Sequence, residues 1–128
     1  MLKGIDNVGV AVTDLARSVA FYEKLGFHKG DDYEADVKGC TMSSETAVLF
    51  LFQTRHSPQA VGREASLANN PPGLDHISFL VDDVNQSYAE CRARGVSFLG
   101  EPEDQDWGAR IAAFKDPDGN NLYLLQYL

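Results

Sequence analysis

The stretch "IDNVGVAVTDLARSVAFYEKLGF", residues 5–27, decides the fold because it occurs twice in the chain. Residues 74–96, "LDHISFLVDDVNQSYAECRARGV", align with it without a gap at an offset of 69 residues. Six aligned pairs are identical: Asp6–Asp75, Val12–Val81, Asp14–Asp83, Ser18–Ser87, Ala20–Ala89 and Gly26–Gly95. At one pair the chemistry changes, because Asn7 aligns with His76. A repeat of this kind predicts a duplicated supersecondary unit.

Each copy carries the signals of a strand followed by a helix. In residues 5–12, apolar side chains alternate with small or polar ones and β-branched residues are frequent, which is typical of a strand. Thr13 or Asp14 can then cap a helix, and Gly26 stands where a left-handed C-terminal cap is needed. Asp83 and Gly95 repeat these signals in the second copy.

Strand-like sequence follows each helix. The expected strands are 27–37, 38–44 and 47–53 in the first half, and 96–100, 109–115 and 121–128 in the second. Residues 116–120, "DPDGN", predict a tight hairpin turn between the last two. The sequence therefore predicts an α+β fold, in which a strand, a helix and three strands occur twice within one domain, 1–128. Module one is 1–53, a polar connector is 54–73 and module two is 74–128.

A sheet of four strands with a single helix covers only one of its faces. Two such modules can turn their open faces toward each other and leave a cavity, which is the natural place for a functional site. Gly9, Ala11 and Ser78 are small residues on the expected open faces, which favours a cavity over a filled core.

The composition excludes several classes of partner. A formal charge of −8 over 128 residues leaves no basic surface for nucleic acid. Two cysteines, Cys40 and Cys91, are too few for a disulfide framework and favour a reducing, cytoplasmic location. The N-terminal residues lack the features of a signal peptide, and no apolar run approaches the roughly 20 residues of a membrane helix.

Three segments resemble the vicinal oxygen chelate superfamily, which includes glyoxalases, extradiol dioxygenases and bleomycin-resistance proteins. They are "NVGVAVTDLARSVAFYEKLGF", "DHISFLVDDV" and "WGARIAAFKDPDGNNLYLLQ". The resemblance implies two βαβββ modules that form a curved mixed sheet around a cup, often in a homodimer. In metal-dependent members, His or Glu from the first and last strands of each module holds a divalent metal.

The corresponding positions in this chain are Asn7, Phe50, His76 and Tyr123. Only His76 keeps a side chain of the usual ligand type, because a phenylalanine cannot ligate and a tyrosine with a pKa near 10 is a poor ligand. We therefore expect no metal and no other cofactor.

The residues expected to line the cup follow from strand alternation and from the resemblance. His76 is the candidate catalytic residue, either as a general base or as a ligand contact. The alternative is a histidine that hydrogen-bonds Asn7 or Tyr123 and serves packing. The candidate ligand-binding residues are Asn7, Phe50, Phe52, Ser78, Trp107, Arg110, Tyr123 and Leu125. For Trp107 and Arg110 the alternatives are that the indole covers a sheet edge and that the guanidinium pairs with a nearby acid. Gln53 and Gln126 are expected on the opposite faces.

Three functions remain open at this level. The first is a metal-independent binding protein for a small, partly aromatic or apolar molecule. The second is an enzyme of the superfamily (a lyase, isomerase or dioxygenase) with an atypical or metal-free site that uses His76. The third is a scaffold whose cup is filled by its own side chains. The sequence does not identify the ligand.

Overall fold

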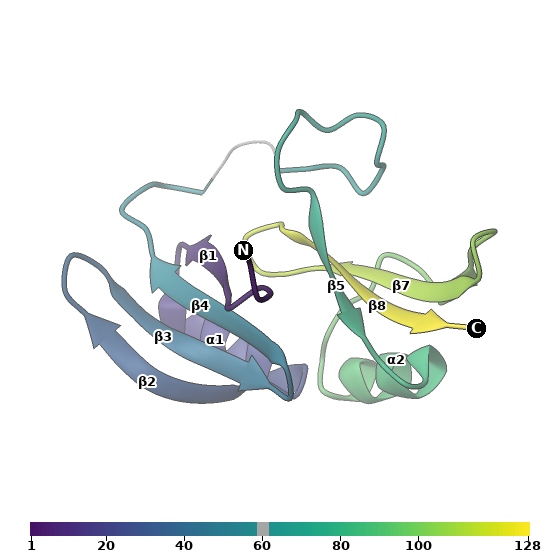
Figure 1. The fold of residues 1–128 in the computed structure, drawn as a ribbon, viewed down its shortest axis with the longest axis horizontal. Helices are drawn as coiled ribbons and strands as arrows, with labels where there is room; N and C mark the ends of the chain where they lie inside the picture. The colour runs from purple at the N-terminus through teal and green to yellow at the C-terminus, as the bar shows by residue number, and fades with distance from the viewer. Residues whose placement is uncertain (59–61) are drawn as a thin grey trace. The chain divides into compact units, whose positions relative to one another are not determined.

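The computed structural model describes residues 1–58 and 62–128, and it confirms two βαβββ modules. The chain divides into two compact units, 1–58 and 59–128 (Figure 1). The expected connector, 54–73, crosses this division, and its residues 59–61 lie outside the described residues.

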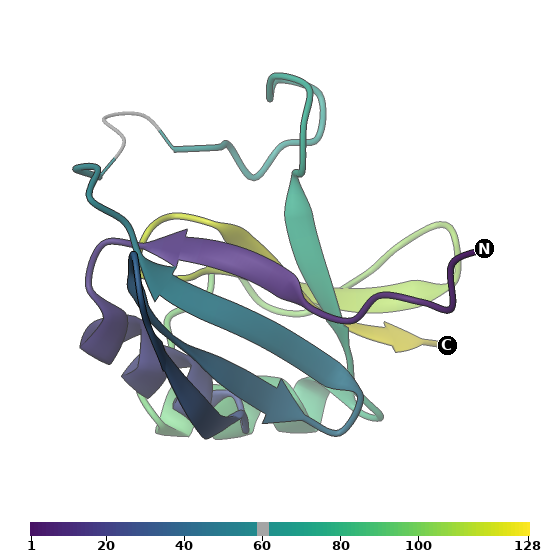
Figure 2. The ribbon, with the colours of Figure 1, turned by 60° about the vertical axis from the view of Figure 1, so that its left-hand side comes forward.

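The first unit contains one helix and a four-stranded sheet. Its elements are β1 (Val8–Val12), α1 (Leu15–Lys24), β2 (His28–Glu34), β3 (Lys38–Ser44) and β4 (Ala47–Gln53). The strand order is β1-β4-β3-β2, with β1 parallel to β4 and the other neighbours antiparallel. Figure 2 shows β1 and β4 running in the same direction.

The second unit repeats this topology. Its elements are β5 (His76–Leu80), α2 (Val84–Ala93), β6 (Glu103–Asp104), β7 (Ala109–Lys115) and β8 (Asn121–Tyr127). The strand order is β5-β8-β7-β6, with β5 parallel to β8 and the other neighbours antiparallel. Among the described residues, no helix is long and apolar enough to cross a membrane.

Both helices begin in the same way. Asp14 and Asp83 are the N-caps, with extended φ angles of −141° and −140°, and each carboxylate accepts the backbone N–H three residues on. Gly26 and Gly95 follow the helices with φ angles of +99° and +94°, as the sequence predicts.

A glutamine at the end of each last strand completes the start of each helix. The Oε1 atom of Gln53 accepts the backbone N–H of Leu15 at 3.1 Å, and that of Gln126 accepts the N–H of Val84 at 2.9 Å. Both side chains therefore lie on the helix-covered face of their sheet, as strand alternation predicts.

Each core lies between a helix and one face of its sheet. In the first unit, Val12, Met42, Leu51 and Tyr22 are fully buried. In the second unit, Val84, Phe114 and Leu122 are fully buried. Because strand side chains alternate, the residues between these core positions lie on the uncovered face, here called the open face of each sheet.

One expected strand was wrong. Residues 96–100 form no strand; Phe98 makes a single bridge with Phe114, and the two-residue strand β6 comes later, at Glu103–Asp104. The reason is packing, because the ring of Phe98 lies between those of Tyr88 and Phe114, with centroid distances of 4.7 and 4.9 Å. Pro102, which has no N–H to donate, then separates this segment from β6.

Candidate functional site

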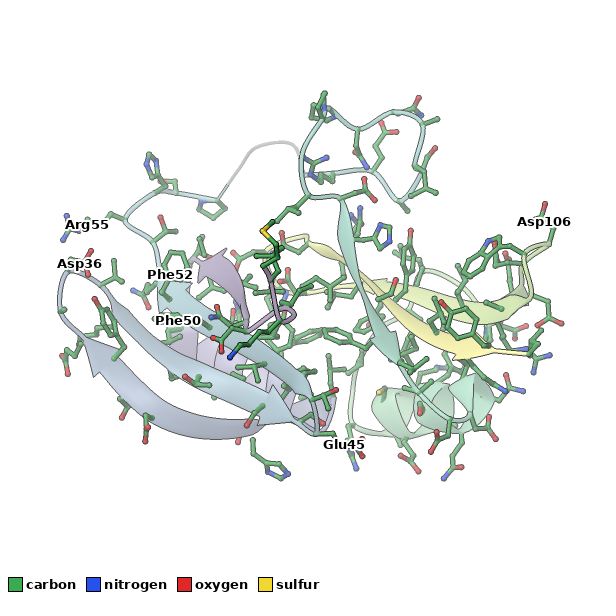
Figure 3. All side chains as sticks on the ribbon, viewed as in Figure 1. Asp36, Glu45, Phe50, Phe52, Arg55 and Asp106 are labelled. Atoms are coloured by element: carbon green, nitrogen blue, oxygen red, sulfur yellow. The ribbon has the colours of Figure 1, made fainter. Side chains whose placement is uncertain are left out.

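Three aromatic rings lie together in the first unit. Phe50 and Phe52 alternate with the buried Leu49 and Leu51 along β4, so they lie on the open face (Figure 3). The Phe50 ring is 5.5 Å from that of Tyr33 and 5.7 Å from that of Phe52, measured between centroids. These distances are typical of aromatic pairs in contact.

Two glycines lie beneath the rings. A Cβ atom at Gly39 would lie 3.0 Å from the Phe50 ring and 2.6 Å from the carbonyl oxygen of Leu51. A Cβ atom at Gly9 would lie 3.6 Å from the Phe52 ring. The rings therefore lean over backbone that carries no side chain, which makes this part of the open face flat and aromatic.

Polar groups border the aromatic cluster at one edge. The Tyr33 hydroxyl donates to the Asp36 carboxylate at 3.1 Å, and this hydrogen bond raises the pKa of Tyr33. The Arg55 guanidinium donates to the backbone carbonyl of Asp36 at 2.9 Å, and Figure 3 shows Arg55 and Asp36 at this edge.

In the second unit, His76 at the start of the edge strand β5 contacts Tyr123 of β8 on the open face. Their rings are 4.7 Å apart between centroids, with an interplanar angle of 63°. Ser78 is the strand partner of Tyr123, and Leu125 lies two residues farther along β8 on the same face. Burial and, to a smaller degree, the charge of Asp75 raise the pKa of Tyr123, so its phenol stays protonated and can donate a hydrogen bond.

His76 is held by the residue before it. Its Nδ1 atom lies 2.7 Å from Oδ2 of Asp75, and the other carboxylate oxygen accepts from the side-chain amide of Asn70 at 2.9 Å. The hydrogen bonds to His76 and then to Asn70 lower the pKa of Asp75, so this carboxylate is ionised at neutral pH.

The sequence prediction missed Asp75 and Asn70. The repeat contained a signal for the first of them, because Asp6 aligns with Asp75. In the first unit the Asn7 amide donates to the Asp6 carboxylate at 2.8 Å, which is the same arrangement with an amide in place of the imidazole. Asn7 is exposed and directly precedes β1.

Trp107 and Arg110 differ in their placement. The Trp107 ring is 55% exposed and contacts Tyr127, which lies on the same face of β8 as Tyr123 and Leu125. The Arg110 guanidinium binds both oxygens of Asp104, at 2.6 and 3.2 Å. Arg110 pairs with Gln126 across the sheet, so it belongs to the helix-covered face and does not join His76 and Tyr123.

The comparisons with known proteins assign the family. A family model described as Glyoxalase/Bleomycin resistance protein/Dioxygenase superfamily matches residues 4–124. The chain belongs to this superfamily.

Relatives in the superfamily resemble the chain over different lengths. The uncharacterized protein YetH of Bacillus subtilis (strain 168) is 31% identical over 134 residues, which cover 98% of this chain and 99% of YetH. A bleomycin resistance protein of Klebsiella pneumoniae is 34% identical over 68 residues, or 43% of this chain and 54% of that protein. A glyoxylase/bleomycin resistance protein/dioxygenase domain from Frankia sp. EAN1pec has the same fold, with a TM-score of 0.81 at 21% identity over 100% of this chain and 94% of that domain.

The residues at the superfamily's metal positions do not fit a divalent metal. Phe50 offers no donor, the Tyr123 phenol is protonated, and the Asn7 amide donates to Asp6. Within residues 1–58 and 62–128, no group of three or more His, Cys, Asp or Glu side chains could hold a metal ion.

Proposed function

We propose that this protein binds a small, partly aromatic or apolar organic molecule without a metal ion. The observation that carries the proposal is the aromatic cluster of Tyr33, Phe50 and Phe52 on the open face of the first sheet. Tyr33 is 44% exposed, and neither phenylalanine is fully buried.

The physical argument rests on apolar area. Each 100 Å² of apolar surface that a ligand removes from water contributes about 2.5 kcal/mol before the costs of association. Planar molecules fit best, because the glycine backbone beneath the rings offers no protruding side chain. In the second unit, Tyr123 and Leu125 offer a further apolar surface, with Ser78 and His76 as polar neighbours.

A ligand screen tests this proposal. Thermal unfolding is followed with a library of aromatic metabolites, and hits are titrated by calorimetry against wild type, Phe52→Ala and Tyr88→Ala. Tyr88 is the matched control, because it also packs against an aromatic ring, that of Phe98, but lies on α2. Phe52→Ala should weaken binding about tenfold or more, the effect of losing one stacking contact between an aromatic side chain and a planar ligand. Tyr88→Ala should leave the affinity unchanged. Equal affinities in all three proteins would contradict the proposed site.

A second candidate function is metal-free proton transfer, favoured by the Asp75–His76 pair. An imidazole oriented by a carboxylate is a common general base. Tyr123, 4.7 Å from the imidazole, could polarise a developing oxyanion. The test is turnover of any hit from the screen by wild type and by His76→Gln. Equal rates in the two proteins would eliminate this candidate.

We further propose a homodimer in the cytoplasm. Membership of the superfamily supports the dimer, and two buried free thiols, Cys40 and Cys91, support a reducing compartment. Light scattering on the purified chain decides the dimer, and a mass of about one chain, 14.1 kDa, would contradict it.

A further inference from the structure

The residues that precede β5 form a hydrogen-bonded chain that ends on the open face of the second sheet. The Asn70 amide donates to Asp75 Oδ1 at 2.9 Å, and Asp75 Oδ2 lies 2.7 Å from Nδ1 of His76. Both oxygens of one carboxylate are therefore engaged, which fixes its orientation. The side chains of Asp75 and His76 are 26% and 32% exposed.

Asn70 is itself fixed by the fold of its loop. Its amide oxygen accepts the backbone N–H of Glu64 and its amide nitrogen donates to the Glu64 carbonyl, both at 2.8 Å. The same Glu64 carbonyl accepts from the buried Asn121 side chain at 2.8 Å. The Lys115 ammonium donates to the Arg63 carbonyl at 2.6 Å. Thus β7 and β8 hold the loop that holds Asn70.

This geometry determines which imidazole nitrogen carries the proton. An ionised carboxylate only accepts hydrogen bonds, so a neutral His76 must donate through Nδ1–H. Nε2 then presents a lone pair. Within the described part of the chain Nε2 makes no hydrogen bond.

We propose that Asn70 and Asp75 are positioning residues that hold His76 with Nε2 as a hydrogen-bond acceptor, and that the ligand is an aromatic molecule carrying a hydroxyl group. The inference rests on the binding function proposed above and deepens it. The ring of Tyr123 beside the imidazole favours an aromatic ligand. The Nε2 lone pair favours a ligand that carries a hydrogen-bond donor. A neutral aromatic hydroxyl supplies both features. An aromatic ether of the same shape cannot donate.

The first test measures the tautomer of His76 without any ligand. Nitrogen-15 chemical shifts of the imidazoles are recorded at pH 8, above the ordinary histidine pKa of about 6.5. His28→Gln and His56→Gln remove the other two histidines and assign the signals. We expect the proton on Nδ1 in wild type and its transfer to Nε2 in Asp75→Ala, because free histidine favours the Nε2–H form.

Asn70→Ala is the second variant, and Asn69→Ala is its matched control because Asn69 is the exposed neighbour. We expect a mixture of tautomers in Asn70→Ala and the wild-type spectrum in Asn69→Ala. A proton on Nε2 in wild type would overturn the inference. Identical spectra of the two asparagine variants would overturn the role of Asn70. Both results leave the proposed binding function standing, because neither measurement includes a ligand.

The second test uses two probes of nearly equal shape, 2-naphthol and 2-methoxynaphthalene, in titration calorimetry. Wild type should bind the naphthol about three- to tenfold more tightly, the usual effect of one hydrogen bond. His76→Phe should lose this preference and bind the two probes with similar affinities. Equal affinities of wild type for the two probes would overturn the inference alone. If wild type bound neither probe, the proposed binding function would fall, and the assignment of the ligand with it.

Discussion

Gly39 offers a sharp test of the packing beneath the aromatic cluster. A Cβ atom there would lie 2.6 Å from the carbonyl oxygen of Leu51 and 3.0 Å from two atoms of the Phe50 ring. Both distances are well below the separation of about 3.5–4.0 Å at which non-bonded carbon atoms attract. The oxygen belongs to the backbone of the central strand β4, so it cannot move as a side chain can.

We expect Gly39→Ala to destabilise the protein by about 2 kcal/mol. Overpacking a well-packed site costs about 1–3 kcal/mol, and a backbone clash in a buried position belongs at the upper end. The alanine recovers about 0.5–1 kcal/mol, because a glycine in a strand loses more conformational entropy on folding.

Urea unfolding followed by circular dichroism measures the effect, and Gly30→Ala is the matched control. Gly30 lies on the neighbouring strand β2, where a Cβ atom would be 3.5 Å from its nearest neighbour, an ordinary contact. Its replacement should change the free energy of unfolding by no more than about 0.5 kcal/mol in the destabilising direction, since surface-type changes are small.

Two outcomes would refute the reasoning. One is a Gly39→Ala protein within about 0.5 kcal/mol of wild type. The other concerns Phe50→Leu, which removes the ring but leaves the Leu51 carbonyl in place. Because the backbone contact is the shorter one, Gly39→Ala should remain strongly destabilising in the Phe50→Leu protein. If the cost vanished there, the ring alone would be its cause.

Four other measurements test the structure. Ser18→Ala should stabilise the protein by up to about 1 kcal/mol in urea unfolding, because its hydroxyl is buried without a hydrogen-bond partner among the described residues. Gln126→Ala, which leaves the Val84 N–H without its acceptor, should cost about 1 kcal/mol; Gln53→Ala should cost less, because its bond is exposed. Zinc or nickel should leave the melting temperature unchanged. A metal site would instead raise the free energy of unfolding by about 2.7 kcal/mol at a metal concentration 100 times its Kd. The pKa of Asp75 is lowered in the folded state. The contribution of Asp75 to the free energy of unfolding is therefore complete above its unfolded pKa near 3.9, and it is lost as pH falls through the lower folded pKa. The difference in stability between wild type and Asp75→Asn should accordingly shrink below about pH 4.

Strand patterns predicted the framework because they depend on local sequence. The expected strands 38–44, 47–53 and 109–115 coincide with β3, β4 and β7, and the duplicated caps lie where the repeat places them. The strand expected at 96–100 was wrong, because the Phe98 ring packs against the helix and β7. The sequence pattern shows that an apolar side chain stands at Phe98. It does not reveal whether the backbone there pairs with a neighbouring strand.

The surroundings of His76 could not be predicted in the same way. Asn70 lies in a loop without hydrophobic periodicity, and it is held by Glu64, whose carbonyl bonds a side chain 57 residues away, Asn121. Such a contact depends on the tertiary fold rather than on spacing. Arg110 shows the opposite case, because the alternative of pairing with a nearby acid was open from the sequence and the structure shows that pair with Asp104.

The two modules differ most clearly in what their first strands present to a ligand. Asn7 and His76 have equivalent positions, and each bonds the carboxylate of the preceding aspartate. The Asn7 amide uses one N–H in that bond and keeps a second N–H and a weak carbonyl acceptor. The imidazole uses one nitrogen in the same bond and keeps a second, more basic nitrogen on a rigid ring. The duplicated aspartate therefore has a different consequence in each module. In the first module the Asp6 carboxylate only holds an amide, whereas in the second module the Asp75 carboxylate fixes the tautomer of an imidazole.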